Sequence, residues 1–317
     1  MNKQRRLFLN QISFVAAAAA LARPMASVAS ISKRINTLHA SGHDVTIYHT
    51  NDLNGNIDAV HNNIGGLNQI KTLLKNQETG GLLLDAGSFL NASNSLERQK
   101  QMISKMNAMG YHVAAVGNNE LLHGQDHLAS LVPLMQFTLV NCNLQFENKL
   151  SGLVKPYIII NSGKFKIGIT GVCNELKGIK YNDAIQSANK VARILKENEK
   201  CDLVICLSHL GYKQEGDKPD NQKLAEQSEN IDMIIGGQNR KLFSNTTVLR
   251  NKLKHEIIVA QTAWDGLMFG RVVFGFGNEN QRNGIRAKHF MPGLADNKTI
   301  AASLPALCLM ENQFISA

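Results

Sequence analysis

Five times along the chain, a short apolar run ends in a polar loop, and helical stretches separate several of these units. The run Val45–Tyr48 leads into Asp52-Leu53-Asn54, and four later stretches have the same form: Leu82–Ser88, Val113–Glu120, Leu203–His209 and Met233–Arg240. Alternating strands and helices favour an α/β domain. Because such folds place polar loops at the carboxyl ends of their strands, we expect the five loops to converge on one site.

The remaining segments complete this pattern. Apolar periodicity predicts helices and additional strands between the five units. The helices are predicted over 67–75, 96–109, 123–135, 189–198 and 221–228, and the strands over 137–141, 157–161, 165–172, 256–261 and 271–276. Strand character is lost after Gly277, and residues 300–310 fit a helix packed on the body. We therefore predict one domain over residues 43–277, a preceding linker at 30–42 and a tail at 278–317.

The first 29 residues predict an export signal, to be left out of the fold. A basic head precedes an alanine-rich apolar segment, and small residues at 26–29 offer cleavage sites. The run Gln4-Arg5-Arg6-Leu7-Phe8-Leu9-Asn10 is similar to a twin-arginine signal, which predicts a periplasmic protein. An ordinary signal peptide or a transit peptide is the alternative. No apolar run reaches the roughly 18 residues that a membrane span requires.

Charge and cysteine content restrict the function classes. Residues 1–29 hold four basic residues and no acidic one, so the rest of the chain has a net charge of +5 rather than +9. This mild, scattered charge tolerates anionic ligands and does not indicate a nucleic-acid partner. The five cysteines match no metal-binding spacing, and four lie in or beside apolar runs. Buried free thiols are expected, with one disulfide as the alternative.

Taken in order, the five loops resemble those of a known family, the metallophosphatase domain of exported bifunctional 5′-nucleotidases. These proteins belong to the calcineurin-like metallophosphoesterases. The resemblance covers about residues 44–276 and extends to Lys155-Pro156-Tyr157, Lys166–Gly171 and Asn230–Gly237. It implies a four-layer αββα sandwich, in which two mixed sheets pack face to face with helices outside. It also implies a dinuclear metal centre that hydrolyses phosphate esters, since two metals generate a hydroxide nucleophile and clamp the phosphoryl oxygens.

The resemblance keeps three of the family's metal-ligand positions. Asp52 matches the carboxylate of the first motif, Asn118 the amide of the third and His209 the histidine of the fourth. A structural histidine is the alternative interpretation of His209 once its partners are lost. Glu120 is interpreted as a structural carboxylate rather than a general base.

The other positions of the family's motifs are substituted. The histidine that would assist the leaving group is replaced by Asn119, so no residue is assigned a catalytic role with confidence. The positions of the bridging aspartate and of three histidine ligands hold residues that coordinate divalent metals weakly or not at all. These substituted positions are Asn54, Ser88, Gln238 and Arg240.

One carboxylate, one imidazole and one amide do not hold a dinuclear centre. The sequence therefore predicts no cofactor, or at most one weakly bound divalent metal. Arg240 places a permanent cation where a ligand would stand, and we expect it within salt-bridge reach of Asp52. The pocket would still offer Arg240, Asn118 and Asn119 to a phosphate-like anion.

The resulting hypothesis is an exported metallophosphoesterase-fold protein that acts as a non-catalytic binding or partner subunit. Few residues follow the family-like region, and they include two aromatics, Phe290 and Phe314. The base-binding half of the two-domain nucleotidases would then come from a separate polypeptide. The alternative is an active phosphomonoesterase with a remodelled one-metal site.

Overall fold

The computed structural model describes residues 42–61, 63–77, 80–93, 95–242, 246–278 and 281–293. The signal segment 1–29, the linker up to residue 41 and the helix expected over 300–310 lie outside these ranges. None of the helices in the described ranges combines the length and hydrophobicity needed to cross a membrane.

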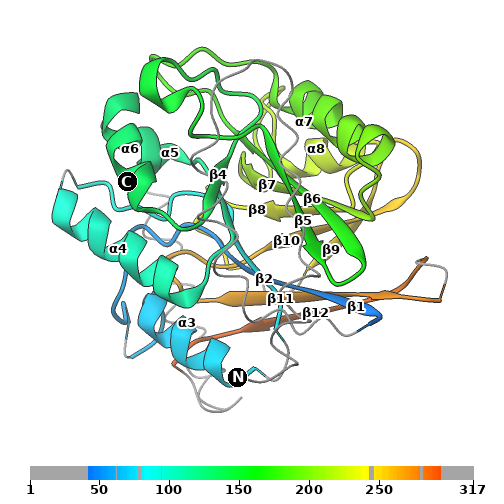
Figure 1. The fold of residues 1–317 in the computed structure, drawn as a ribbon, viewed down its shortest axis with the longest axis horizontal. Coiled ribbons are helices and arrows are strands. Elements are labelled where there is room, and N and C mark those ends of the chain that lie inside the picture. Colours follow the sequence, from blue (N-terminus) through cyan, green and yellow to red (C-terminus); the bar gives the residue numbers. More distant parts are fainter. Residues whose placement is uncertain are drawn as a thin grey trace, which may run out of the picture.

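The described chain folds into two six-stranded mixed sheets (Figure 1). The first sheet has the order β12-β11-β1-β2-β3-β4, in which β1 to β4 run parallel to one another and β11 runs antiparallel to both of its neighbours, β1 and β12. Its strands are β1 (Asp44–Thr50), β2 (Leu82–Asp85), β3 (Val113–Ala115), β4 (Thr138–Val140), β11 (Phe269–Phe276) and β12 (Arg282–Phe290).

The second sheet has the order β5-β6-β7-β8-β10-β9, with a parallel centre and an antiparallel strand at each edge. Its strands are β5 (Tyr157–Ser162), β6 (Phe165–Cys173), β7 (Leu203–His209), β8 (Met233–Gly236), β9 (Thr247–Arg250) and β10 (Glu256–Gln261). The expected hairpin is β5 and β6, joined at Gly163, whose positive φ of 60° suits the turn.

Helices cover the outer face of each sheet, which gives the expected four layers (Figure 1). The first sheet packs against α3 (Gly66–Lys75), α4 (Leu96–Met109), α6 (Gln125–Leu131) and η1 (Val132–Leu134). The second packs against α7 (Ala184–Arg193), its π-helical extension η3 (Ile194–Asn198) and α8 (Asn221–Gln227). The short elements α5 (Asn118–Leu121) and η2 (Asn148–Leu150) lie in the connections.

Three apolar clusters explain why these elements assemble. The central one lies between the sheets and includes Ile47, Leu84, Ile205 and Phe274, each fully or almost fully buried. A second fills the space between the first sheet and α3, α4 and α6, and a third that between the second sheet and α7 and α8. Because the parallel strands bury both faces, their sequences are continuous apolar runs rather than alternating ones.

Some elements differ from the sequence predictions. The expectation that strand character ends at Gly277 is wrong, because β12 pairs along the whole of β11 and extends the first sheet. β9 and the helix α5 were not predicted. The helix expected over 189–198 begins earlier, at Ala184, where the Asp183 side chain accepts a hydrogen bond from the Gln186 amide.

All four described cysteines are free thiols, as expected, and three of them are buried. Cys308 lies outside the described residues.

Candidate functional site

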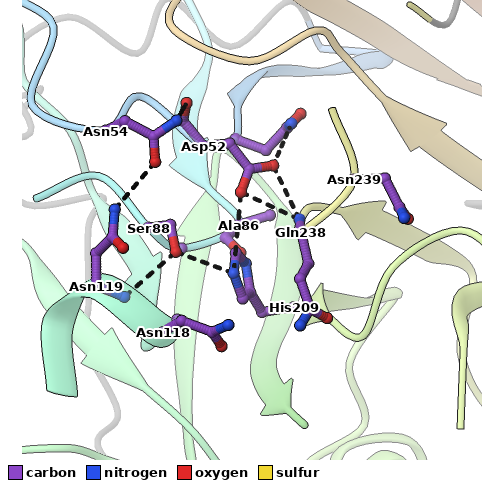
Figure 2. Close-up of polar contacts among 12 residues, drawn as sticks. Asp52, Asn54, Ala86, Ser88, Asn118, Asn119, His209, Gln238 and Asn239 are labelled. Atoms are coloured by element: carbon purple, nitrogen blue, oxygen red, sulfur yellow. Dashed lines mark hydrogen bonds and ion pairs between the residues drawn. The ribbon is translucent and has the colours of Figure 1, made fainter. Parts of the chain in front are cut away.

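The five loops meet at one end of the sandwich, at the carboxyl ends of parallel strands from both sheets. Main-chain hydrogen bonds tie the loops to one another: the amide of Asp52 donates to the Gly87 carbonyl at 3.0 Å, and that of Asn54 donates to the Ser88 carbonyl at 2.9 Å. Figure 2 shows side chains from all five loops, which face one another here. The predicted convergence is therefore present in the structure.

The backbone of this region is unusual. Nine non-glycine residues in the described chain have a positive φ, and five of them lie in these loops or beside them: Asp52, Asn54, Ser88, Gln238 and Asp265. Such conformations are costly for residues with a side chain, and they cluster at functional sites, where the surrounding structure enforces them. The backbone therefore marks the same site as the sequence motifs.

Asp52 is the carboxylate at the centre of the site. Its two oxygens accept hydrogen bonds from the main-chain amide of Gln238, at 3.1 and 2.9 Å, and one of them also accepts from the Asn51 side chain at 2.9 Å. Burial raises the pKa of Asp52, while His209 and these hydrogen bonds act in the opposite direction. The carboxylate is thus held by neutral donors of the protein itself.

The prediction for Arg240 holds only in its electrostatic part. Arg240 is exposed and lowers the pKa of Asp52, but burial, His209 and the hydrogen bonds from Asn51 and Gln238 are larger causes. The Gln238 main-chain amide makes the kind of close contact with the Asp52 carboxylate that was expected of the Arg240 guanidinium group. His209 is a basic side chain close to Asp52, with Nε2 at 3.9 Å from Oδ1.

Both ring nitrogens of His209 are engaged. Nδ1 lies 2.9 Å from the Ala86 carbonyl oxygen, and Nε2 lies 3.0 Å from the Ser88 hydroxyl (Figure 2). Because a carbonyl oxygen only accepts, Nδ1 carries a proton, and Nε2 faces the hydroxyl. His209 is 1% exposed, so these two partners fix the orientation of its ring.

The asparagines at the start of α5 have different surroundings. The side-chain NH₂ of Asn119 donates to the Asn54 side chain at 3.0 Å and to the Leu90 carbonyl at 2.9 Å, which uses both of its hydrogens. Asn119 therefore connects loops rather than presenting its amide to an anion. The Asn118 side-chain oxygen lies 3.8 Å from the Cys173 sulfur.

Glu120 has the structural role expected from the sequence. Its carboxylate accepts hydrogen bonds from the amides of Ser88, Leu90 and Gly117, at 2.8, 2.9 and 2.8 Å. Burial is the main cause that raises its pKa, and these hydrogen bonds oppose the shift. Glu120 thereby joins the second loop to the third.

Asp265 is a site residue that the sequence reasoning missed. Its amide donates to the Asp52 carbonyl at 2.7 Å, and its carboxylate accepts from the Asn54 side chain at 2.7 Å. Burial raises its pKa. The available signal was positional: β10 runs parallel to β8, and the polar loop that follows β10 makes a sixth strand-end loop at this edge.

The donor set does not match a dinuclear metal centre. Within the described ranges, no three or more His, Cys, Asp or Glu residues are grouped so as to hold a metal ion. The two nitrogens of His209 already have partners, and the Asp52 carboxylate faces an N–H donor. The hydroxyl of Ser88 lies 3.0 Å from His209 Nε2, and hydroxyls are weak neutral ligands.

Comparisons with known proteins agree with the fold. No family model matches the chain. The trifunctional nucleotide phosphoesterase YfkN of Bacillus subtilis is 25% identical over 276 residues, which cover 74% of this chain and 18% of that protein. The 5′-nucleotidase of Vibrio cholerae is 27% identical over 222 residues, which cover 62% of this chain and 40% of that protein. The chain thus corresponds to less than half the length of either relative.

A solved structure gives the same answer at the level of the fold. The 5′-nucleotidase precursor of Thermus thermophilus superposes with a TM-score of 0.71 at 21% identity, over 84% of this chain and 60% of that one. The four layers of this chain agree with the fold of these relatives. The chain is a homologue of the 5′-nucleotidase-type calcineurin-like metallophosphoesterases and has their fold.

Proposed function

We propose that this protein uses the phosphoesterase fold for binding, as a non-catalytic binding or partner subunit. The observation that supports this most directly is the Asp52 carboxylate, whose two oxygens both face the Gln238 main-chain amide. A divalent cation at Asp52 would meet the positive end of that N–H dipole. Removing the hydrogen bond would also cost about 1.5–3 kcal/mol, the range for hydrogen bonds to charged groups.

The ligand we propose is a small phosphate-like anion. Arg240 is exposed beside the site, and its charge reaches both Asp52 and Asp265, whose pKa values it lowers. A guanidinium group binds tetrahedral oxyanions with two parallel hydrogen bonds. Because Asn119 is occupied by its protein partners, Arg240 and Asn118 are the stronger candidates for this contact.

A single-metal phosphomonoesterase is the second candidate. It is supported by the proximity of the retained positions. Asp52 Oδ1 lies 3.9 Å from His209 Nε2. Asn118 begins α5, and the main-chain amide of the next residue, Asn119, points at the Ser88 hydroxyl. A metal bound there would require the Gln238 amide to move away from Asp52. Its chemistry would be to polarise a phosphoryl oxygen.

One experiment with two arms separates these candidates. In the first arm, inorganic phosphate is added to EDTA-treated protein, and binding predicts a rise in Tm. The Arg240→Gln variant should lose this rise. The control variant Lys241→Gln, at the exposed neighbouring residue, should still show it. In the second arm, Mn²⁺, Co²⁺ or Zn²⁺ is added with an aryl phosphate or AMP. We expect substoichiometric metal after gel filtration and no metal-dependent turnover. Turnover that Asp52→Ala or His209→Ala abolishes would establish the enzyme instead.

Export and partnership complete the proposal. We infer export from the twin-arginine-like segment, and subcellular fractionation of the full chain checks it. The proposed partner is a polypeptide of the nucleotidase C-terminal type, since the relatives are much longer than the region they share with this chain. Co-elution of such a purified domain with this protein tests the pairing, and separate elution at micromolar concentrations contradicts it.

A further inference from the structure

A serine and a histidine from different sheets form a hydrogen-bonded pair at the base of the site. Ser88 follows β2 of the first sheet, and His209 ends β7 of the second; Oγ and Nε2 are 3.0 Å apart (Figure 2). The Ala86 carbonyl accepts from Nδ1 at 2.9 Å, so a ring with its proton on Nδ1 alone has its Nε2 lone pair facing the serine hydroxyl. In this tautomer His209 is oriented to accept the Ser88 proton.

We propose that Ser88 is a nucleophile, activated by His209, that takes up the acyl group of a neutral activated ester. This activity requires no metal and does not depend on the phosphate-binding function proposed above. The arrangement meets the geometric requirement for an activated serine: nucleophile and base lie within hydrogen-bond distance, and a third group, here a main-chain carbonyl, orients the base.

The backbone around Ser88 is built to hold this geometry. Ser88 has a φ of 56°, a conformation that is costly for a residue with a side chain, and its amide is fixed by the Glu120 carboxylate at 2.8 Å. Gly117 makes the close approach possible, since a Cβ atom there would lie 2.9 Å from the Ser88 hydroxyl oxygen and 3.0 Å from His209 Nε2. The Asn119 amide points at the hydroxyl from 3.5 Å.

The proposed reaction balances with an ester and water alone. The Ser88 oxygen attacks the ester carbonyl carbon while its proton passes to His209 Nε2. The ester C–O bond then breaks, the alcohol leaves with the proton from Nε2, and Ser88 becomes the acyl ester. Water hydrolyses that ester by the same steps in the same order, with Nε2 taking the water proton and returning it to Ser88.

Charge favours a neutral electrophile over a phosphate dianion. Asp52 Oδ1 lies 3.9 Å from His209 Nε2, so a charged carboxylate there stabilises the imidazolium that forms when the Ser88 proton is taken. The same negative charge repels a dianion at Ser88. An uncharged carboxylic ester therefore suits the serine, while an anion binds further out, beside the exposed Arg240.

The test is labelling of EDTA-treated protein with p-nitrophenyl acetate and with a neutral fluorophosphonate, followed by peptide mass spectrometry. We expect the adduct on Ser88 and none on the exposed Ser93, which serves as the internal control. Ser88→Ala abolishes the adduct. His209→Gln slows its formation by at least about 100-fold, the smallest contribution usual for a positioned general base.

A second variant keeps the test decisive if His209→Gln folds poorly. Ser88→Cys retains a nucleophile, and its thiol should react with iodoacetamide faster when His209 is present than in the double variant Ser88→Cys/His209→Gln, with circular dichroism as the check of folding. An unlabelled Ser88 in the folded wild type, or equal labelling rates with and without His209, overturns the proposal. Neither result bears on metal or phosphate binding.

Discussion

Single residues hold the site together through main-chain groups more than through side-chain pairs. Glu120 accepts from three amides in two loops, Asn119 joins a side chain of the first loop to the second, and the Asp265 amide binds the Asp52 carbonyl. These contacts explain why five residues in or beside these loops adopt a positive φ. The sequence identified the residues of the five loops, but it does not encode which neighbour a loop amide will choose.

Glu120→Gln tests this interpretation. The replacement puts an NH₂ group against amides that need an acceptor, so at least one buried N–H loses its partner. We expect a loss of about 1.5–3 kcal/mol in the free energy of unfolding, the range for hydrogen bonds to charged groups. Urea denaturation measures it, and Glu97→Gln, at a side chain that is 77% exposed, is the matched control. Equal stability of the two variants would contradict the role assigned to Glu120.

At the scale of elements, the buried strands were predictable, and two of the four edge strands in the described chain, β9 and β12, were not. The inner strands β2, β7 and β8 are continuous apolar runs, whereas β9 and β12 are edge strands of mixed polarity. β12 begins with Arg282-Asn283-Gly284, a run that is typical of a turn, and only its pairing with β11 identifies it as a strand. Its strand character arises from long-range hydrogen bonds, and a local sequence pattern does not contain them.

A row of three residues fixes how β1, β11 and β12 fit together. Gly270 pairs with His49 on one side and with His289 on the other, and the two imidazole rings approach edge to face at 6.1 Å. A Cβ atom at position 270 would lie 2.0 Å from His49 Nε2. Gly270 is therefore required by packing and not by its backbone angles.

Gly270→Ala should destabilise the protein by about 1–3 kcal/mol, the usual cost of overpacking a well-packed core. Chemical denaturation measures the loss. Gly284→Ala is the control, because nothing lies within 4 Å of a Cβ atom at that position of β12. If the cause is the clash with the imidazole ring, His49→Ala in the Gly270→Ala background recovers part of the loss; no recovery would point to another cause.

For the whole molecule, the buried histidine His49 makes stability depend on pH. Burial, and then the neighbouring His289, lower the pKa of His49 from 6.5 to about 3. Between these two values the unfolded chain binds a proton at this position and the folded chain does not. Stability is therefore fully present above pH 6.5 and falls as the pH decreases, by up to about 1.4 kcal/mol per pH unit from this residue.

Comparing the wild type with His49→Met isolates this contribution from the site carboxylates, whose raised pKa values act in the opposite direction. From pH 7 to pH 5 the wild type should lose about 2 kcal/mol relative to the variant. Urea unfolding at both pH values measures the difference. The same comparison with His255→Gln, at an exposed histidine, is the control, and a gap that does not change with pH would rule out the linkage.

The sequence predicted the architecture of the whole molecule more completely than it predicted the contacts within the site. The order of strand, polar loop and helix predicted the layers and the meeting of the loops, because side-chain period and chain direction are local properties. The partner of Asp52 was not predictable in the same way. Side-chain charge suggested Arg240, whereas the structure supplies the Gln238 amide, a group that every residue but proline possesses.

The Gln238 amide also affects how easily this site could become a metal centre. Gln238 reaches Asp52 with a φ of 77°, so the contact depends on the path of the main chain and not on the identity of the side chain. Exchanging side chains for metal-binding ones at positions 54, 88, 238 and 240 would leave that N–H in place. Under the proposed non-catalytic function, a metal centre at this site would therefore need a rebuilt loop as well as new ligands, so no single substitution would create one.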